Sequence, residues 1–182
     1  MKIIQHGFTM TEMVAVMAIV AILMALGVPS YRYVTNSNRM SAEVNGLLGD
    51  MQFARSEAIK EGRTVTICVS GDGASCTNST LWQRGWIVFS DVNNDATRQA
   101  ATEPVLRVQP PFSGSDTLQD SANTLQSVTF NREGFATGLP AGGATIVVHD
   151  LNSNPVWTRC LSISLVGMLT TTTHTKSPAQ CT

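Results

Sequence analysis

Charged side chains are scarce in this chain, and the deficit is concentrated near the N-terminus. Asp, Glu, Lys and Arg make up 14% of the 182 residues, against about 25% in a typical soluble domain. Between Phe8 and Pro29 the single ionisable side chain is Glu12. The formal net charge is -1, so the chain as a whole has no electrostatic attraction for nucleic acid.

The sequence also has little of what enzymes use for acid–base or nucleophilic chemistry. It contains only three histidines. It lacks the P-loop, the Rossmann fingerprint, the Gly-x-Ser-x-Gly elbow and the His-Glu-x-x-His zinc motif. His149 precedes Asp150 at the end of a predicted strand, where a surface turn pair is favoured over a catalytic dyad. We therefore predict a protein that is not an enzyme and that needs no cofactor.

An apolar stretch fills the region where charge is missing. Residues Met13–Val28 are all apolar or glycine, and with the residues from Phe8 onward they make ~31 Å of helix at about 1.5 Å per residue. That is about the hydrocarbon thickness of a bilayer. A secretory signal peptide is the alternative, but no small-x-small cleavage site follows the run, and helical periodicity continues. We predict a spanning helix, kinked at Gly27 and Pro29.

Glu12 is costly at the start of such a helix, by about 2 to 3 kcal/mol on insertion scales. Cleavage between Gly7 and Phe8 would create an ammonium group close to it. In a filament, Glu12 of one subunit would face the Phe8 ammonium of a neighbour, and both charges would be neutralised in an apolar core. The alternative is that Glu12 lies at the level of the lipid headgroups.

The segment Gly7-Phe8-Thr9-Met10-Thr11-Glu12, followed by the apolar run, resembles the cleavage and methylation motif of type IV prepilins and pseudopilins. Met10 replaces a more usual Leu. The resemblance implies that prepilin peptidase removes a leader of residues 1–7 and that Phe8 is N-methylated. It also implies that residues 8–29 anchor the chain in the inner membrane, with the head in the periplasm, before they enter a filament.

Beyond the anchor, apolar residues recur at helical spacing and predict an amphipathic helix over 30–62, with Gly62 as its C-cap. The pattern then changes to short β-branched segments separated by turn clusters. The expected strands are Thr64–Val69, Trp86–Phe89, Val105–Val108, Ser127–Phe130, Thr145–Val148 and Arg159–Val166. We expect an α+β protein, with one long N-terminal helix packed on a mostly antiparallel sheet and a β-rich head over 63–182.

Short segments of the head, in this order, resemble the GspH/FimT group of minor pilins and pseudopilins. They are Phe53–Lys60, Gly85–Phe89, Glu103–Arg107 and Phe130–Gly134. Together with the N-terminal motif the resemblance covers about Gly7 to Gly167, and it implies the type IV pilin fold.

The four cysteines are Cys68, Cys76, Cys160 and Cys181. No Cys-x-x-Cys pair is present, which argues against a zinc knuckle or a thioredoxin-like site. An even number behind an export signal favours two disulfides over buried free thiols. Of the three possible connectivities we favour Cys68–Cys76 with Cys160–Cys181, because each closes a local loop.

Asp91, Asn93 and Asp95 place oxygen atoms at alternate positions, as at the start of a calcium loop. Ala96 stands where such a loop needs Gly, and Thr102 where it needs a bidentate Glu. A solvated turn is therefore favoured over a metal site.

Some members of the FimT group are associated with DNA uptake, and the resemblance places a basic Gly-Arg-x-Arg-like motif near their C-terminus. The corresponding stretch here, Gly167–Thr170, contains no arginine. Because phosphate contacts need clustered Lys or Arg, this departure argues against nucleic acid as a partner. The alternative is a basic face assembled from Arg84, Arg98, Arg107 and Arg159.

The leading interpretation is a minor pilin of a type IV pilus, a structural subunit that primes or joins filament assembly with other major and minor pilins. One alternative is a pseudopilin of type II secretion, because the same anchor serves both systems. The other is a DNA-binding minor pilin for competence.

Overall fold

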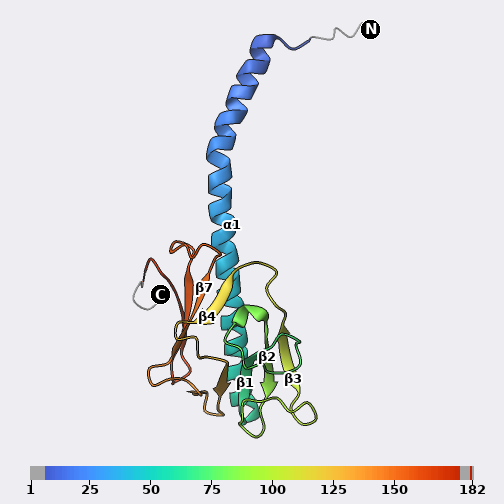
Figure 1. Ribbon diagram of the computed structural model, residues 1–182, viewed down its shortest axis with the longest axis vertical. Helices are drawn as coiled ribbons and strands as arrows, with labels where there is room; N and C mark the ends of the chain where they lie inside the picture. Colours follow the sequence, from blue (N-terminus) through green and yellow to red (C-terminus); the bar gives the residue numbers. More distant parts are fainter. Residues whose placement is uncertain (1–6, 177–180, 182) are drawn as a thin grey trace. The chain divides into compact units, whose positions relative to one another are not determined.

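The computed structural model describes residues 7–176 and residue 181 (Figure 1). The chain forms two compact units, residues 1–38 and residues 39–182. Of the predicted leader only Gly7 belongs to the described part, so residues 1–6 lie outside it. The predicted boundaries at 7, 29 and 62 therefore stay predictions about processing and membrane insertion.

Helix α1 spans Met10–Glu61. It begins after Thr9, whose hydroxyl oxygen accepts a hydrogen bond from the Glu12 amide at 3.3 Å, as an N-cap residue does. The helix continues through Pro29, as expected, while the kink at Gly27 and Pro29 stays a prediction. Gly62 follows with φ +67° and donates its amide to Ala58 O at 3.0 Å. This is the predicted glycine C-cap.

In the first unit, the side chains from Phe8 to Val34 are all exposed. An 18-residue window of α1 near the N-terminus is long and apolar enough to cross a membrane, and 0% of it is buried. By length and composition, this segment therefore meets the expectation for a spanning helix.

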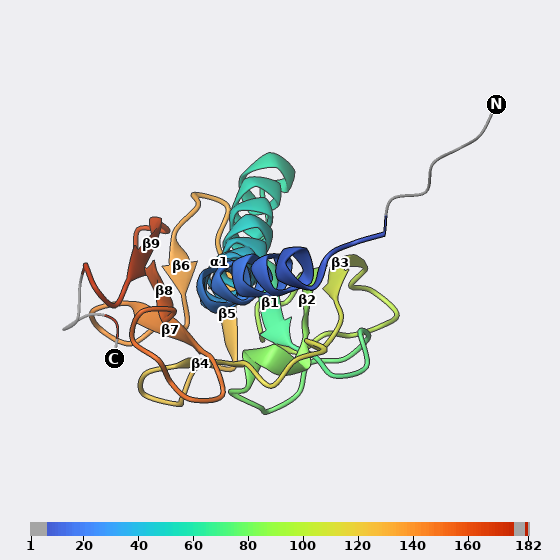
Figure 2. The same ribbon diagram turned by 90° about the horizontal axis from the view of Figure 1, so that it is seen from above.

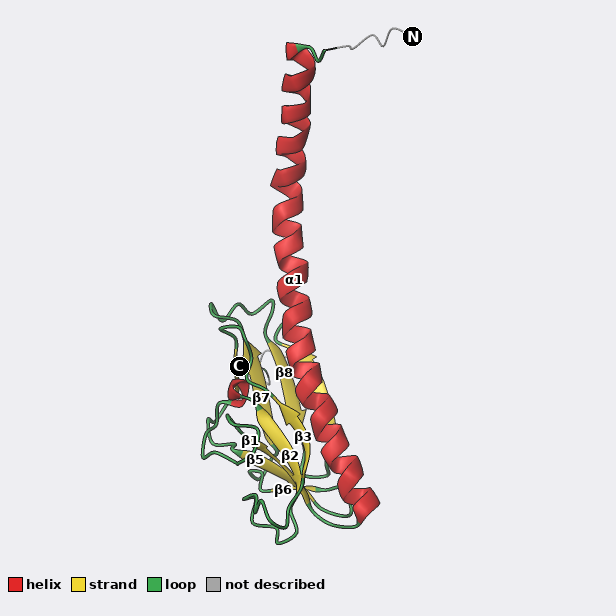
Figure 3. Ribbon diagram, turned by 90° about the vertical axis from the view of Figure 1, so that its right-hand side faces the viewer, coloured by secondary structure: helices red, strands yellow, loops and turns green. Residues whose placement is uncertain are grey.

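In the second unit, one face of α1 lies against the strands (Figure 3). The buried residues of this face are Met40, Val44, Leu47, Met51, Ala54 and Ala58. Their spacing alternates between four and three residues, which keeps them on a single stripe of the helix. The amphipathic segment predicted from the sequence thus forms one wall of the head's core.

Within the described residues, nine strands form two antiparallel sheets. The first sheet has the order β3-β2-β1-β5-β6, with β1 Val65–Val69, β2 Trp86–Ser90, β3 Val105–Gln109, β5 Ser127–Phe130 and β6 Ala136–Thr137. The second has the order β4-β7-β8-β9, with β4 Thr117–Asp120, β7 Ala144–His149, β8 Arg159–Ile163 and β9 Leu169–Thr173. The antiparallel prediction is confirmed, but the prediction of a single sheet is wrong.

Both sheets contribute to one core with α1 (Figure 2). Ile67, Val88 and Phe130 come from the first sheet, while Leu118 and Ile146 come from the second. Because α1 presents a stripe of small and medium apolar residues, the two sheets share the same helix face. Residues of both sheets and of α1 therefore belong to the same hydrophobic cluster.

A short 3-10 helix, η1 (Trp82–Arg84), precedes β2 and carries a buried tryptophan. The Trp82 indole N–H donates to Leu125 O at 3.0 Å. Its ring centroid lies 6.4 Å from that of Trp86, which is also buried. These two tryptophans are therefore core residues.

Candidate functional site

The predicted assembly motif lies at the exposed start of the chain's first unit. Phe8 is 78% exposed, and Glu12 lies in the first turn of α1. A carboxylate there is favoured by the partial positive charge of the helix N-terminus. No cation in the described part of the chain pairs with Glu12. The structure therefore places its carboxylate where a group from outside the chain can reach it.

The apolar surface that follows Glu12 is continuous. Large side chains such as Met17 and Leu23 are more than 60% exposed. Gly27 leaves a shallow apolar hollow on the helix, with Val20, Leu23 and Tyr31 among the residues that line it. Surface of this extent needs a lipid or protein environment.

A polar junction that the sequence analysis did not identify ties the start of the head's helix to the loop before β4. We call Arg39, Glu43 and Asp116 the Arg39 junction. The Arg39 guanidinium forms an ion pair with the buried Asp116 carboxylate. Its two contacts are Nη2–Oδ1 at 2.9 Å and Nε–Oδ2 at 2.6 Å. Burial and the neighbouring Asp116 carboxylate raise the pKa of Glu43 to about 7. Both contacts of the guanidinium go to Asp116, and Glu43 holds a proton to near neutral pH.

Asp50 forms a second polar link between α1 and the first sheet. Its carboxylate accepts the Trp86 indole N–H at 2.9 Å and the Arg107 Nη1–H at 2.9 Å. The Arg107 guanidinium also lies 3.9 Å from the centroid of the Phe53 ring, a cation–π contact. Arg107 is therefore engaged by its own chain.

A third link joins α1 to loops of both sheets, near Gly167–Thr170, the stretch that corresponds to the DNA-uptake motif of some FimT-group members. Arg55 Nε donates to Gly134 O at 2.9 Å. Gly167 is buried with φ +75°, and a Cβ there would collide with Gly134 O. The exposed side chains beside it, Val166 and Met168, are apolar. At this corner of the head the Arg55 side chain is used for packing, and the exposed side chains are apolar.

The basic face considered as an alternative is largely engaged by the protein itself. Arg98 donates to Glu103 O at 2.9 Å and to Ala74 O at 2.6 Å. Arg159 donates to Val156 O at 3.0 Å. Arg84 is the exception: it is exposed, and its guanidinium has no partner among the described residues. Phosphate contacts need clustered cations, and within this set only Arg84 has a guanidinium without a partner among the described residues.

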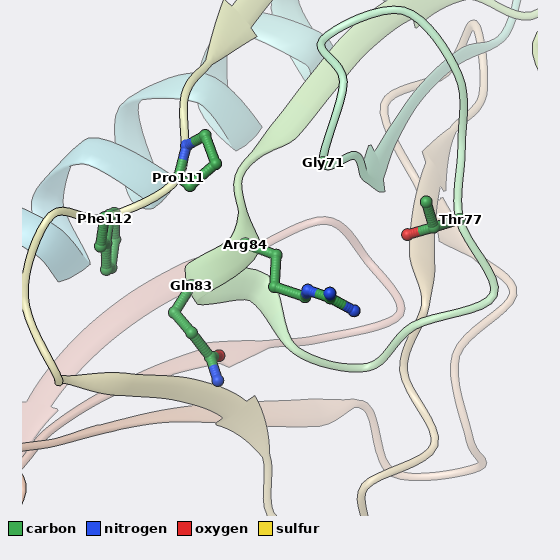
Figure 4. Close-up of a pocket in the computed structure, with 6 residues that line it drawn as sticks. All are labelled: Gly71, Thr77, Gln83, Arg84, Pro111 and Phe112. Atoms are coloured by element: carbon green, nitrogen blue, oxygen red, sulfur yellow. The ribbon is translucent and has the colours of Figure 1, made fainter.

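Arg84 belongs to a pocket beneath the loop that follows β1 (Figure 4). The pocket has a volume of about 450 Å³ and is lined by Gly71, Thr77, Gln83, Arg84, Pro111 and Phe112; we call it the Arg84 pocket. In Figure 4 the Arg84 side chain extends across this space toward the loop that carries Thr77. From the sequence, Arg84 was predicted only as one of the four arginines of an alternative basic face.

Both favoured disulfides are present. Cys68 is bonded to Cys76, and Cys160 to Cys181, with Cα–Cα distances of 5.6 Å in each. The first closes the loop over the Arg84 pocket. The second attaches the C-terminal segment to β8.

The Asp91 segment forms a turn stabilised by its own donors. Asp91 is buried and accepts hydrogen bonds from Thr66 Oγ1 at 2.7 Å and from the Ala96 amide at 3.0 Å. Asn93 Nδ2 donates to Asp95 Oδ2 at 2.9 Å, and Asn93 Oδ1 accepts the Asp95 amide at 3.3 Å. The described residues contain no cluster of three His, Cys, Asp or Glu side chains suited to a metal. A turn is confirmed, although Asp91 itself is not solvated.

His149 ends β7, as predicted, and its Nδ1 lies 3.2 Å from Thr158 Oγ1. Burial lowers the pKa of His149. The Asp150 carboxylate accepts the Asn154 amide at 2.6 Å, so it caps a turn. The two side chains therefore have separate structural partners.

Residues 43–167 match the family model described as type II transport protein GspH. Residues 4–28 match the prokaryotic N-terminal methylation motif. No curated protein sequence matches the chain significantly.

Among solved structures, the chain is similar to the type IV minor pilin FimU of Pseudomonas aeruginosa. Two crystal structures of FimU match with 23% identity and TM-scores of 0.62 and 0.57, covering 82% and 80% of this chain and 99% of FimU in each case. The minor pseudopilin EpsH of Vibrio cholerae matches with 9% identity and a TM-score of 0.49, over 73% of this chain and 95% of that one. The likeness to FimU shows that the predicted type IV pilin fold is correct.

Proposed function

The chain belongs to the GspH family of type II transport proteins, and on that premise we propose that it is a minor pilin, a structural subunit that primes or joins the assembly of a type IV pilus. The same fold in FimU, a type IV minor pilin, supports this choice within the family. Its partners would be the other major and minor pilins of the filament.

The observation that carries the proposal is the first unit of the chain. Its apolar surface from Phe8 to Val28 is exposed throughout, and Glu12 is its one ionisable side chain. A bilayer covers such a surface before assembly, and the equivalent helices of neighbouring subunits cover it afterwards. We infer that the inner membrane holds the anchor as a single span with the head in the periplasm.

Glu12 has a defined task in this proposal. Prepilin peptidase cuts between Gly7 and Phe8, and Phe8 is then N-methylated. The Phe8 ammonium of one subunit pairs with Glu12 of the next, which offsets the cost of ~2 to 3 kcal/mol for a carboxylate in a spanning helix. The match to the N-terminal methylation motif supports this processing.

The first experiment measures sheared surface pili in an in-frame deletion strain and in its complemented control. A large loss that complementation restores is expected of a subunit that primes assembly. Unchanged pili, together with the absence of the chain from the sheared fraction, would refute the proposal.

Glu12→Ala tests the pairing within the same strain. We expect the variant to reach wild-type levels in the membrane and to fall by about tenfold in sheared filaments, since an unpaired terminal ammonium remains in the apolar core. Glu133→Ala, an exposed glutamate of the head, is the matched control and should be incorporated normally. Incorporation of Glu12→Ala at the control level would contradict the pairing.

A pseudopilin of type II secretion is the second candidate, and the description of the matching family favours it. The deletion strain separates the two. A fall in secreted protein with normal pili would assign the chain to secretion.

A further inference from the structure

Arg84 differs from every other arginine of residues 39–176. Each of the others has an ion pair or a carbonyl acceptor: Arg39 with Asp116, Arg55 with Gly134, Arg63 with Glu61, Arg98 with Glu103, Arg107 with Asp50, Arg132 with Glu133 and Arg159 with Val156. Within the described part of the chain the Arg84 guanidinium has neither. Its five N–H donors are available to a group from another molecule.

The walls of the Arg84 pocket are fixed by contacts that do not involve the guanidinium. Ser70 donates its amide to Gly85 O at 2.9 Å, and Thr77 donates its amide to Val69 O at 2.8 Å. The Cys68–Cys76 disulfide closes the loop between these two points. On this side of the pocket the backbone is therefore held in place before any ligand arrives.

The opposite wall is held equally well. The Phe112 amide donates to Gln83 O at 3.0 Å, and the Phe112 ring packs edge-on against Trp86 with centroids 5.9 Å apart. Gly85 has φ +96°, and a Cβ there would lie 2.6 Å from Gln109 O. This close approach draws η1 against the segment after β3. The pocket is thus a preformed cavity with one free cation, which reduces the entropy lost when a ligand binds.

Asp72, the acidic side chain of the loop that follows β1, has its hydrogen bonds within that loop. Asp72 accepts hydrogen bonds from Ser75 Oγ at 2.6 Å and from the Ala74 amide at 2.9 Å. These bonds lower the pKa of Asp72, and its charge serves the turn of its own loop. Among the residues that line the pocket, Arg84 alone is charged.

We propose that the Arg84 pocket receives the carboxylate of an Asp or Glu side chain from a neighbouring subunit of the filament. A planar guanidinium binds a carboxylate through two parallel hydrogen bonds. The volume of about 450 Å³ is many times the roughly 10 to 15 Å³ that one water needs, so it admits an acidic side chain. A single free arginine favours this ligand over nucleic acid, whose binding grows with the number of cations.

The inference rests on the proposed function, because it names a partner within a filament. The test uses the full chain in the deletion strain and measures its amount relative to the major pilin in sheared filaments. Arg84→Gln should reach wild-type levels in the membrane and fall about fivefold or more in filaments, as expected when a hydrogen-bonded charge is lost. Arg132→Gln removes an exposed arginine that pairs with Glu133, and as the matched control it should be incorporated normally.

Arg84→Lys tests the chemistry of the partner. The substitution keeps the charge and introduces an amine, which a water-soluble carbodiimide joins to a carboxyl group in direct contact. Sheared filaments should then contain an amide cross-link from position 84 to an Asp or Glu of another subunit, found by mass spectrometry. Wild-type filaments, which lack an amine at this position, should contain none.

The outcomes separate the inference from the proposed function. The amount of wild-type chain in sheared filaments tests the proposed function. The ratio of Arg84→Gln to wild type in the same filaments tests the role of the Arg84 pocket. Normal incorporation of Arg84→Gln, or incorporated Arg84→Lys without the cross-link, would overturn the inference. Salt-dependent DNA binding by the full chain in detergent micelles, lost in Arg84→Gln, would assign the pocket to phosphate and would also overturn it.

Discussion

Replacing Glu43 by Gln should flatten the pH dependence of the head's stability between about pH 5 and about pH 8. Glu43 lies in the Arg39 junction, where Asp116 already occupies the Arg39 guanidinium through two contacts. A protonated Glu43 donates a hydrogen bond to Asp116, whereas an ionised one repels it. Glutamine keeps the shape and a donor at every pH, so it removes the titration without leaving a cavity.

The sign follows from the proton balance. Glu43 has a pKa of about 7 in the folded chain and an ordinary value of 4.5, so the folded state binds more protons between these two values. The free energy of unfolding therefore falls as pH rises through this window. At ~1.36 kcal/mol per pH unit the ceiling is ~3 kcal/mol. Because Glu43 is only half-buried, solvent screening reduces this, and we expect about 1 to 1.5 kcal/mol.

The assay is urea unfolding of the full chain in detergent micelles, followed by tryptophan fluorescence, since Trp82 and Trp86 are buried in the head. The quantity of interest is the difference in unfolding free energy between wild type and Glu43→Gln at each pH, which cancels titrations that both share. Glu133→Gln, at an exposed glutamate, is the control and should follow wild type.

Parallel pH profiles for wild type and Glu43→Gln would refute the argument, because they would mean that Glu43 titrates normally in the folded chain. A profile in which wild type gains stability with rising pH relative to the variant would reverse the sign and assign Glu43 a cationic partner.

Two further predictions concern the packing of the head and are checked by the same unfolding assay. Gly167→Ala should destabilise the head by ~3 kcal/mol. The new Cβ would collide with Gly134 O, and the residue would also keep a positive φ. Gly138→Ala, at φ +77° with nothing within 4 Å, isolates the backbone strain and should cost only ~1 kcal/mol; equal losses would contradict the collision. Removing the disulfide with Cys160→Ser and Cys181→Ser should lower the free energy of unfolding by ~3 kcal/mol. The reason is that the bond closes a loop with a sequence separation of 21. An unchanged urea midpoint would show that the bridge does not constrain the chain.

The sequence predicted the helix well because its evidence is local and repeated. The buried stripe from Met40 to Ala58 follows helical periodicity, and Gly62 ends it as a glycine C-cap does. Strands β1, β2, β5 and β7 were also predicted, since each is rich in β-branched or aromatic residues. β8 ends at Ile163, before the expected Val166, because Ser164 starts the turn to β9.

The missed strands had weak local signals. β4 has Leu118 as its one large apolar residue, and β6 contains only Ala136 and Thr137. β9 is a threonine run at the edge of the second sheet, where composition alone does not separate an edge strand from a loop. Without β4 and β9 the second sheet could not be recognised, which explains the prediction of one sheet.

The site residues divide in the same way. Gly7, Phe8 and Glu12 form a contiguous motif, so the sequence was enough to select them. Arg39 and Asp116 are 77 positions apart, and one sequence does not show that they meet. A usable signal existed for Glu43, because charges that flank a buried helical stripe often pair with the surface that covers it.

The order in which the core is assembled along the chain has a consequence for export. The core joins Met40 near its beginning to Leu161 and Ile163 near its end, and the last bridge needs Cys181. Most of these contacts are distant in sequence, and such contacts form slowly. If the head is exported across the inner membrane, as we propose, it therefore cannot complete this core until residues 161 to 163 have crossed. During that interval its apolar strands are exposed, so we expect a periplasmic holding chaperone and a thiol oxidase to act before the subunit can enter a filament.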